Sequence, residues 1–163
     1  MSGVVADTSV WIELFAGRPV PALEEALRQG LVVLAPIVVA ELISGARRAR
    51  DRTAIQDLVE ELPVHETPLE HWVRVGDLRR RLAGRGVSVS TPDAHVAQCA
   101  PERDAVLLTR DAIFARIAEA SELRLQRGRR PVPSGVPRAN ACSTACGCSQ
   151  PSPTRRARAP SFR

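Results

Sequence analysis

The sequence predicts an α/β fold in which a short parallel sheet lies between layers of helices. Short apolar runs alternate along the chain with longer segments whose apolar residues recur at helical spacing, as in parallel α/β domains. The chain has 163 residues, 44% of them hydrophobic, which is enough for one domain with its own core. Acidic residues follow several of the apolar runs, and parallel sheets bind ligands beyond the carboxyl ends of their strands.

The expected strands are short and apolar, as buried strands of a parallel sheet are. They cover residues 4–6, 31–34, 105–108 and 123–125, with a more polar candidate at residues 63–66. Because Val and Leu dominate these runs, helices are expected to cover both faces of the sheet.

The segments between the strands have the spacing and the end signals of helices. The expected helices cover residues 8–15, 21–29, 36–45, 51–61, 69–83, 91–99 and 111–119. Pro36 suits the first turn of a helix, Thr8 or Ser9 can cap the first helix, and Thr91 can cap the sixth. The apolar face expected for the longest helix consists of Trp72, Val75, Leu78 and Leu82.

Charge divides the chain into two parts. Residues 1–126 have a net charge of −3, whereas residues 127–163 contain eight Arg, no acid and six of the 13 Pro. The second part has almost no large aliphatic residues, so it cannot bury enough apolar surface to fold. We therefore expect a folded domain over residues 1–126 and a disordered basic tail over residues 127–163.

The tail contains three of the four cysteines, Cys142, Cys146 and Cys148, without a nearby histidine and at a spacing unlike that of zinc pairs. Its charge could raise RNA affinity non-specifically, but its biased composition favours a segment without a selected role. Cys99 is the one cysteine of the expected domain, so disulfides do not build the fold.

Targeting signals are not visible in the sequence. The first residues lack a charged segment ahead of an apolar one, so we expect no signal peptide. The apolar stretch over residues 31–40 is interrupted by Pro36 and is much shorter than the ~20 residues of a membrane helix. A cytoplasmic protein without a membrane partner is expected.

Four acids occupy positions typical of an active edge. Asp7 follows the first strand, Glu41 interrupts an apolar helical segment, Asp93 lies in the first turn of a helix, and Asp111 follows the strand over residues 105–108. Each one alone could be a helix cap or a solvated side chain. Together they predict a site for a divalent cation, because clustered carboxylates repel one another by about 4 kcal/mol per pair at 4 Å and an effective dielectric of 20.

The four strings that carry these acids resemble, in order, the motifs of PIN-domain nucleases and more narrowly of VapC toxins. They are Val-Val-Ala-Asp-Thr-Ser-Val-Trp-Ile ending at residue 12, Val-Ala-Glu-Leu around Glu41, Thr-Pro-Asp-Ala-His-Val-Ala from Thr91, and Leu-Leu-Thr-Arg-Asp-Ala-Ile-Phe ending at residue 114. The resemblance covers most of residues 3–125 and stops before the tail. It implies a PIN-like three-layer α/β/α fold.

The resemblance also implies a function and its residues. It implies an endoribonuclease that hydrolyses RNA with Mg²⁺ or Mn²⁺ held by Asp7, Glu41, Asp93 and Asp111, with Thr109 supporting the last acid. A second acid often follows that last one in the family, and Ile113 stands there instead, which places a second metal ion in doubt. The implied partners are RNA, a VapB-like antitoxin and a second copy of the chain in a homodimer.

Arginines flank the segments that carry the acids and are candidates for RNA contacts, because guanidinium groups bind phosphate in a forked geometry. The candidates are Arg18, Arg47, Arg48, Arg50 and Arg110. The alternative is that those at positions 47, 48 and 50 form only a solvated helix end.

Two other functions compete with this interpretation. A HAD-like phosphatase also begins with an Asp after a strand but needs a second Asp where Ser9 stands. A catalytically inactive PIN fold that acts only as a binding module is compatible with Ile113. The three histidines, His65, His71 and His95, lack metal-type spacing in the sequence, so no histidine site is expected.

Overall fold

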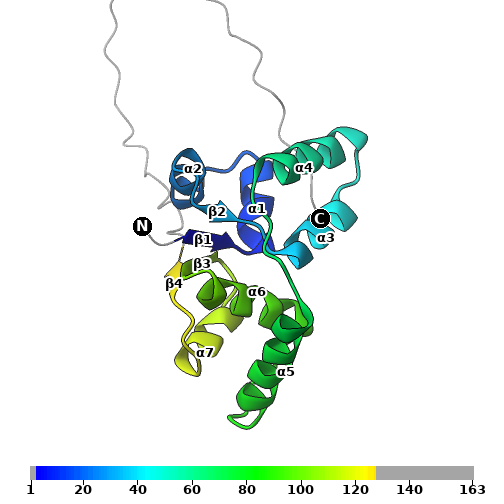
Figure 1. Cartoon of the computed structure of the whole chain (residues 1–163). Helices are drawn as coiled ribbons and strands as arrows, with labels where there is room; N and C mark the ends of the chain where they lie inside the picture. The colour runs from blue at the N-terminus through cyan, green and yellow to red at the C-terminus, as the bar shows by residue number, and fades with distance from the viewer. Residues whose placement is uncertain (1–2, 128–163) are drawn as a thin grey trace, which may run out of the picture.

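A short parallel sheet forms the centre of this computed structural model, which describes residues 3–127 (Figure 1). Its strands are β1 (Gly3–Ala6), β2 (Val32–Val33), β3 (Ala105–Thr109) and β4 (Leu125–Arg127). The strand order is β2-β1-β3-β4, and every neighbouring pair is parallel. The predicted α/β fold with a short parallel sheet is confirmed.

Seven helices connect the strands within residues 3–127. They are α1 (Thr8–Phe15), α2 (Pro21–Arg28), α3 (Pro36–Gly45), α4 (Ala49–Glu61), α5 (Leu69–Ala83), α6 (Thr91–Glu102) and α7 (Ile113–Glu119). Pro36 occupies the first turn of α3 as expected. Gly30, which ends the turn after α2, has a φ of +65°, a backbone conformation that other residues adopt with strain. None of these helices has both the length and the apolar composition needed to span a membrane.

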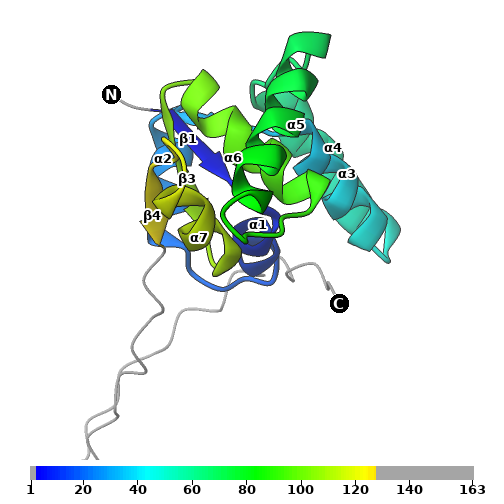
Figure 2. The same cartoon turned by 90° about the horizontal axis from the view of Figure 1, so that it is seen from below.

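Both faces of the sheet are covered. Val5 and Ala6 in β1 and Leu107 and Leu108 in β3 are buried consecutively, although successive side chains of a strand point to opposite faces. This pattern requires a helical layer on each side, as the three-layer prediction states. Figure 2 shows two helix pairs beside the sheet, α5 with α6 and α3 with α4, and α3 also contacts α1 and α6.

Four details of the prediction are wrong. Residues 63–66 form only a single bridge, between Val64 and Leu34, and no strand. The last strand begins at Leu125, where pairing with Leu107 starts, rather than at residue 123. Asp7 caps α1 in place of the predicted Thr8 or Ser9, and Ser90 caps α6 in place of the predicted Thr91.

The fourth detail concerns the buried face of α5. Trp72 is 39% exposed, and the neighbouring His71 is fully buried together with Val75, Leu78 and Leu82. A polar side chain replaces the expected aromatic one because it finds hydrogen-bond partners on α6. Helix α6 itself continues three residues beyond the predicted end at Cys99, which brings Glu102 onto the same helix.

Candidate active site at the carboxyl edge of the sheet

The central strands β1 and β3 bring Asp7 and Thr109 together. Ala6 pairs with Leu108, and the Asp7 backbone N–H donates to the Leu108 carbonyl at 2.9 Å. One residue further along, the Thr109 hydroxyl donates to Asp7 Oδ2 at 3.1 Å. Both side chains are nearly inaccessible, at 8% exposed for Asp7 and 2% for Thr109. The sequence prediction that these two residues share a site agrees with this geometry.

Ser9 completes the environment of the Asp7 carboxylate. Its hydroxyl donates to Asp7 Oδ2 at 2.7 Å, and its backbone N–H points to the same oxygen at 3.4 Å, so Asp7 is also the cap of α1. All the hydrogen bonds that the Asp7 side chain accepts within residues 3–127 go to Oδ2. Helix capping and ligand binding are therefore compatible, because Oδ1 is left for another partner.

Asp111 adjoins this pair on the turn between β3 and α7. Its backbone N–H donates to the Thr109 hydroxyl at 3.0 Å, and its Oδ1 accepts from the Ile113 N–H at 2.9 Å. The side chain is exposed. The Thr109 hydroxyl thus contacts both the buried Asp7 carboxylate and the backbone of the exposed Asp111. Ile113, at the position where the resemblance implies a further acid, contributes its backbone N–H.

Glu41 reaches the same region from α3. Its side chain is half-buried, and Oε2 accepts a hydrogen bond from the Thr8 hydroxyl. Thr8 and Ser9 are consecutive, so the first turn of α1 ties Glu41 and Asp7 to one backbone segment. Glu41, which interrupts an apolar helical segment of the sequence, therefore faces α1, and α3 contacts α1.

Asp93 lies in the first turn of α6 and is half-buried. The Ser90 hydroxyl donates to Asp93 Oδ2 at 2.5 Å and accepts from the Asp93 N–H at 3.1 Å. Among the described residues, Asp93 has no hydrogen bond to the network around Asp7. Hydrogen bonds through Thr109 connect Asp7 with the backbone of Asp111, and Glu41 bonds to Thr8, the residue after Asp7. Asp93 lies on a helix that contacts β1 and α3.

The predicted arginines differ in their surroundings. Arg110 lies beside the site, where its guanidinium contacts Glu13 Oε2 at 2.8 and 2.9 Å and its backbone N–H donates to the Ser9 hydroxyl at 3.2 Å. Arg50 pairs with Asp51 at 3.4 Å. The side chains of Arg18, Arg47 and Arg48 are exposed. Within residues 3–127, Arg110 is the one of the five arginines with a hydrogen bond to the residues around Asp7, from its backbone N–H to Ser9.

A second cluster of titratable side chains is not apparent from the sequence, because its histidines are scattered along the chain. The structure brings His65, His71 and His95 together with Cys99 and Glu102, because α5 packs along α6. A helical signal exists in the sequence: His95, Cys99 and Glu102 recur at positions i, i+4 and i+7. Nothing in the sequence, however, indicates which helix faces them.

The protonation of this second cluster follows from burial and hydrogen bonding. Burial lowers the pKa of His95 to about 4 and raises the pKa of the Cys99 thiol to about 12. Burial would raise the pKa of Glu102, but hydrogen bonds from Arg74, His71 and Gln98 outweigh it and lower that pKa to about 2. Glu102 is therefore an anion surrounded by donors.

The sequence matches the PIN domain family over residues 4–120. The chain belongs to the PIN domain family. The PIN match leaves the HAD-like alternative without support, and it confirms the resemblance drawn from the four acidic strings. No curated protein matches the chain significantly.

Solved structures agree with this assignment. The chain is similar to VapBC from Salmonella typhimurium bound to DNA, with a TM-score of 0.67, 22% identity, and coverage of 79% of this chain and 100% of that one. It is also similar to VapBC-1 from nontypeable Haemophilus influenzae (TM-score 0.63, 28% identity, 76% and 96% covered). A third is VapBC-5 from Mycobacterium tuberculosis (TM-score 0.61, 26% identity, 78% and 99% covered), a member of the VapBC family of toxin-antitoxin systems.

Proposed function

We propose that this chain is a metal-dependent endoribonuclease and the toxin of a toxin–antitoxin pair. The observation that carries the proposal is the Asp7 carboxylate at the carboxyl end of β1. Its Oδ2 is held by Ser9 and Thr109, its Oδ1 is available, and Asp111 and Glu41 are linked to it through neighbouring hydroxyl groups. The PIN family match and the VapBC neighbours support the same function.

The donor set fits a hard divalent cation. Carboxylate and hydroxyl oxygens surround the edge, and Mg²⁺ or Mn²⁺ prefers oxygen ligands. Asp7, Asp93 and Asp111 would hold the ion, with Glu41 as a further acid. A bound Mg²⁺ supplies an activated water and neutralises charge on the phosphate. Within residues 3–127 these acids do not converge into one tight group of ligand atoms, as like charges without a cation repel one another.

The surrounding side chains have separate tasks. Ser9 and Thr109 fix the orientation of Asp7, so that one carboxylate oxygen points away from its protein donors. Glu41, whose Oε2 accepts a hydrogen bond from Thr8, would add a further negative charge beside the ion. The exposed side chains of Arg18, Arg47 and Arg48 would bind phosphates of the RNA backbone, because they can turn toward a ligand.

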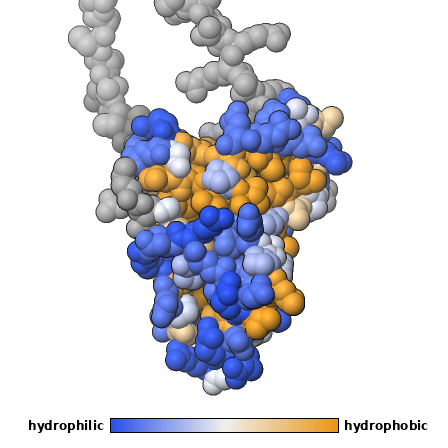
Figure 3. Space-filling view, viewed as in Figure 1, coloured by the Kyte–Doolittle hydropathy of each residue, from blue (hydrophilic) through white to orange (hydrophobic). Residues whose placement is uncertain are grey.

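A VapB-like antitoxin and a second copy of the chain are the proposed protein partners, together with RNA as substrate. The support comes from the VapBC complexes among the similar structures. Apolar surface suited to a protein partner lies beside α4 (Figure 3). The groove between α3 and α4 has a volume of about 480 Å³ and is lined in part by Val39, Ile43 and Val59.

RNA cleavage by the purified full chain tests the proposal. We expect cleavage with Mg²⁺ or Mn²⁺, none in EDTA, and a roughly 100-fold or greater loss in Asp7→Asn, because metal ions contribute several kcal/mol to such reactions. Asp77→Asn is the matched control, since it removes an exposed acid of α5 far from the sheet edge. RNA binding without cleavage under all metal conditions would instead identify an inactive binding module.

Melting curves give a readout that does not depend on choosing the right RNA. Mg²⁺ that binds only the folded chain raises the melting temperature of the parent and of Asp77→Asn. The same concentration should leave Asp7→Asn almost unchanged. Equal stabilisation of all three proteins would show that the ion does not bind at Asp7.

A further inference from the structure

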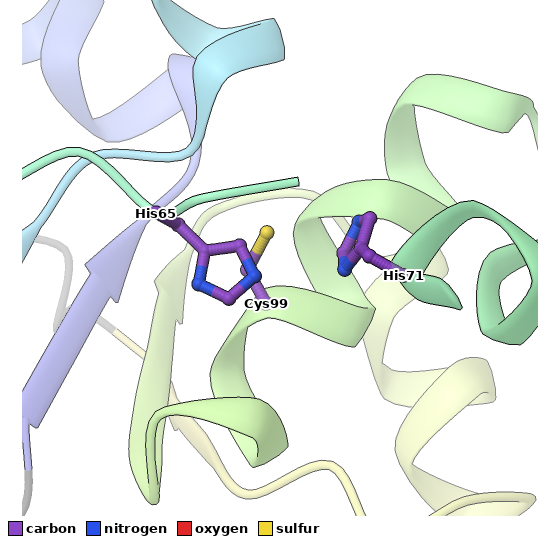
Figure 4. Close-up of side chains that lie close together, drawn as sticks. All are labelled: His65, His71 and Cys99. Carbon is purple, nitrogen blue, oxygen red and sulfur yellow. The ribbon is translucent and has the colours of Figure 1, made fainter. Parts of the chain in front are cut away.

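The second cluster gathers metal-binding side chains from three segments (Figure 4). His65 comes from the segment before α5, His71 from α5, and Cys99 from α6. The three are almost fully buried, at 5%, 0% and 0% exposed. One ligand atom from each residue lies within 4.8 Å of the ligand atoms of the other two. The side chains point toward one another, and none of them belongs to the carboxylate site.

We propose that His65, His71 and Cys99 form a binding site for a divalent transition-metal ion of the zinc class. Two imidazole nitrogens and a thiolate sulfur are ligands that Zn²⁺ and Co²⁺ prefer, whereas Mg²⁺ prefers oxygen. The site is therefore chemically distinct from the acidic edge of the sheet. An ion there would fasten the His65 segment and α5 to α6, the helix that carries Asp93.

Glu102 orients both histidine rings. Its Oε2 accepts from His65 Nε2 at 3.0 Å and from His71 Nδ1 at 2.8 Å. Its other oxygen, Oε1, is held by Arg74 at 2.5 Å and by Gln98 at 3.0 Å. Metal-binding histidines in proteins commonly donate their second ring N–H to a carboxylate, which fixes the tautomer and the ring direction. Glu102 has this relation to both rings.

A surface pocket borders one side of the cluster. It has a volume of about 420 Å³ and is lined by His65, Glu66, Pro68, Arg74, Glu102 and Arg103. Of the three proposed ligands only His65 lines this pocket, so an ion would enter from the His65 side. The carboxylates of Glu66 and Glu102 at the pocket give it acidic groups that attract a cation, while Arg74 and Arg103 oppose one.

Binding requires several rearrangements, because His71 Nε2 already lies 2.8 Å from His95 Nδ1 and His65 Nδ1 accepts a hydrogen bond from Arg103. Tetrahedral zinc, with bonds of about 2.0–2.1 Å to nitrogen and 2.3 Å to sulfur, holds its ligand atoms about 3.3–3.6 Å apart. A separation as wide as 4.8 Å between two ligand atoms must therefore shrink by roughly 1.2–1.5 Å. The Cys99 thiol must also release its proton to solvent, because the thiolate is the ligand.

Arg103 competes with the ion for His65. Its Nε donates to His65 Nδ1 at 3.0 Å. An ion bound at Nδ1 takes the place of this donor. An ion bound at Nε2 would displace Glu102 from that nitrogen and move the ring proton to Nδ1, which then cannot accept from Arg103. In both arrangements the exposed Arg103 side chain must turn away, so its removal should strengthen metal binding.

Cobalt titration of the full chain tests the site. The substitutions Cys142→Ser, Cys146→Ser and Cys148→Ser leave Cys99 as the one thiol, and none of them alters the described residues. We expect Co²⁺ to produce thiolate-to-cobalt charge-transfer absorption that saturates at one equivalent and disappears when Zn²⁺ is added. Carboxylates cannot produce this band, so cobalt at the acidic edge does not interfere. Absence of the band in this folded protein would overturn the proposal.

Variants in the same background locate the ion. Cys99→Ala should abolish the band, and Arg103→Ala should bind Co²⁺ roughly threefold to tenfold more tightly, because one hydrogen bond no longer competes. Arg81→Ala is the control for loss of an exposed arginine elsewhere. Unchanged or weaker Co²⁺ binding by Arg103→Ala would show that the ion binds Cys99 without displacing Arg103 from His65, which would overturn the proposed ligand set.

Discussion

Hydroxyl groups hold the carboxylates of the proposed active site in place. Thr8, Ser9 and Thr109 each donate to an acid, and Thr109 also accepts from the Asp111 backbone. Hydrogen bonds to charged groups contribute more than neutral ones, about 1.5–3 kcal/mol each. The orientation of Asp7 therefore depends on residues that do not themselves bind an ion.

Thr109→Val tests this dependence. The substitution keeps the shape of a buried side chain and removes both hydrogen bonds of the hydroxyl, so we expect a loss of about 1–3 kcal/mol in the free energy of unfolding. RNA cleavage should fall as well, because Asp7 loses a donor. Thr53→Val in α4 is the control, since that hydroxyl is exposed and bonds only to its own helix. Denaturant unfolding and cleavage rates measure the two effects.

The buried histidines predict a pH dependence of stability. Burial lowers the pKa of His95 to about 4, from 6.5. Below pH 6.5 the unfolded chain gains a proton that the folded chain does not take up until about pH 4, so the free energy of unfolding decreases across this window as pH falls. The slope from His95 is at most about 1.4 kcal/mol per pH unit.

His95→Gln should reduce this slope, because Gln does not titrate. The groups that face His95 are His71, Trp72 and Cys99. Denaturant unfolding in EDTA between about pH 4 and pH 7 measures the slope in parent and variant. Identical slopes would show that the loss of stability comes from other groups.

The helices were predictable where capping residues and proline mark their ends, and they were less so elsewhere. Pro36 set the start of α3, whereas Ser90 rather than Thr91 caps α6 because its hydroxyl reaches the Asp93 N–H. The positions of the acids followed from adjacent apolar strands. The histidine cluster did not follow, because it depends on the packing of α5 against α6, which no local pattern encodes.

Ser90→Ala tests the capping of α6. The variant loses the bond to the Asp93 N–H and should cost about 1 kcal/mol in the free energy of unfolding. It also frees the Asp93 carboxylate, so metal-dependent cleavage should decrease. Ser90→Thr keeps a hydroxyl cap and should restore most of both properties. Equal melting temperatures for Ser90→Ala and the parent would contradict this assignment.

At the scale of the whole molecule, the boundary near residue 126 and the disordered basic tail stay predictions, since the tail and its three cysteines lie outside the described residues. Strand β4 pairs Arg127 with Thr109, so the sheet extends at least to that residue. The PIN match ends at residue 120, before β4. Strand β4 is therefore part of the folded domain, because it pairs with β3.

Truncation tests the boundary. A chain that ends at Arg127 should fold with nearly the same melting temperature as the full chain. Its non-specific RNA binding should be weaker and less sensitive to salt, because Arg residues in the tail no longer contribute phosphate contacts. A chain that ends at Glu122 is the control, since it lacks β4 and leaves β3 at the edge of the sheet. Unfolding of the chain that ends at Arg127 would show that the folded domain extends beyond that residue.

The parallel register of β4 also determines where the chain leaves the sheet. Arg127 lies opposite Thr109, and Thr109 bonds to Asp7, so the polypeptide exits at the same edge that carries the acids. Residues 128–163 follow from that edge in the sequence, and they contain seven further Arg and no acid. Covalent attachment gives these Arg a high effective concentration at the edge. The carboxylates of the edge and the phosphates of RNA would then compete for the same Arg side chains, and salt would weaken both interactions.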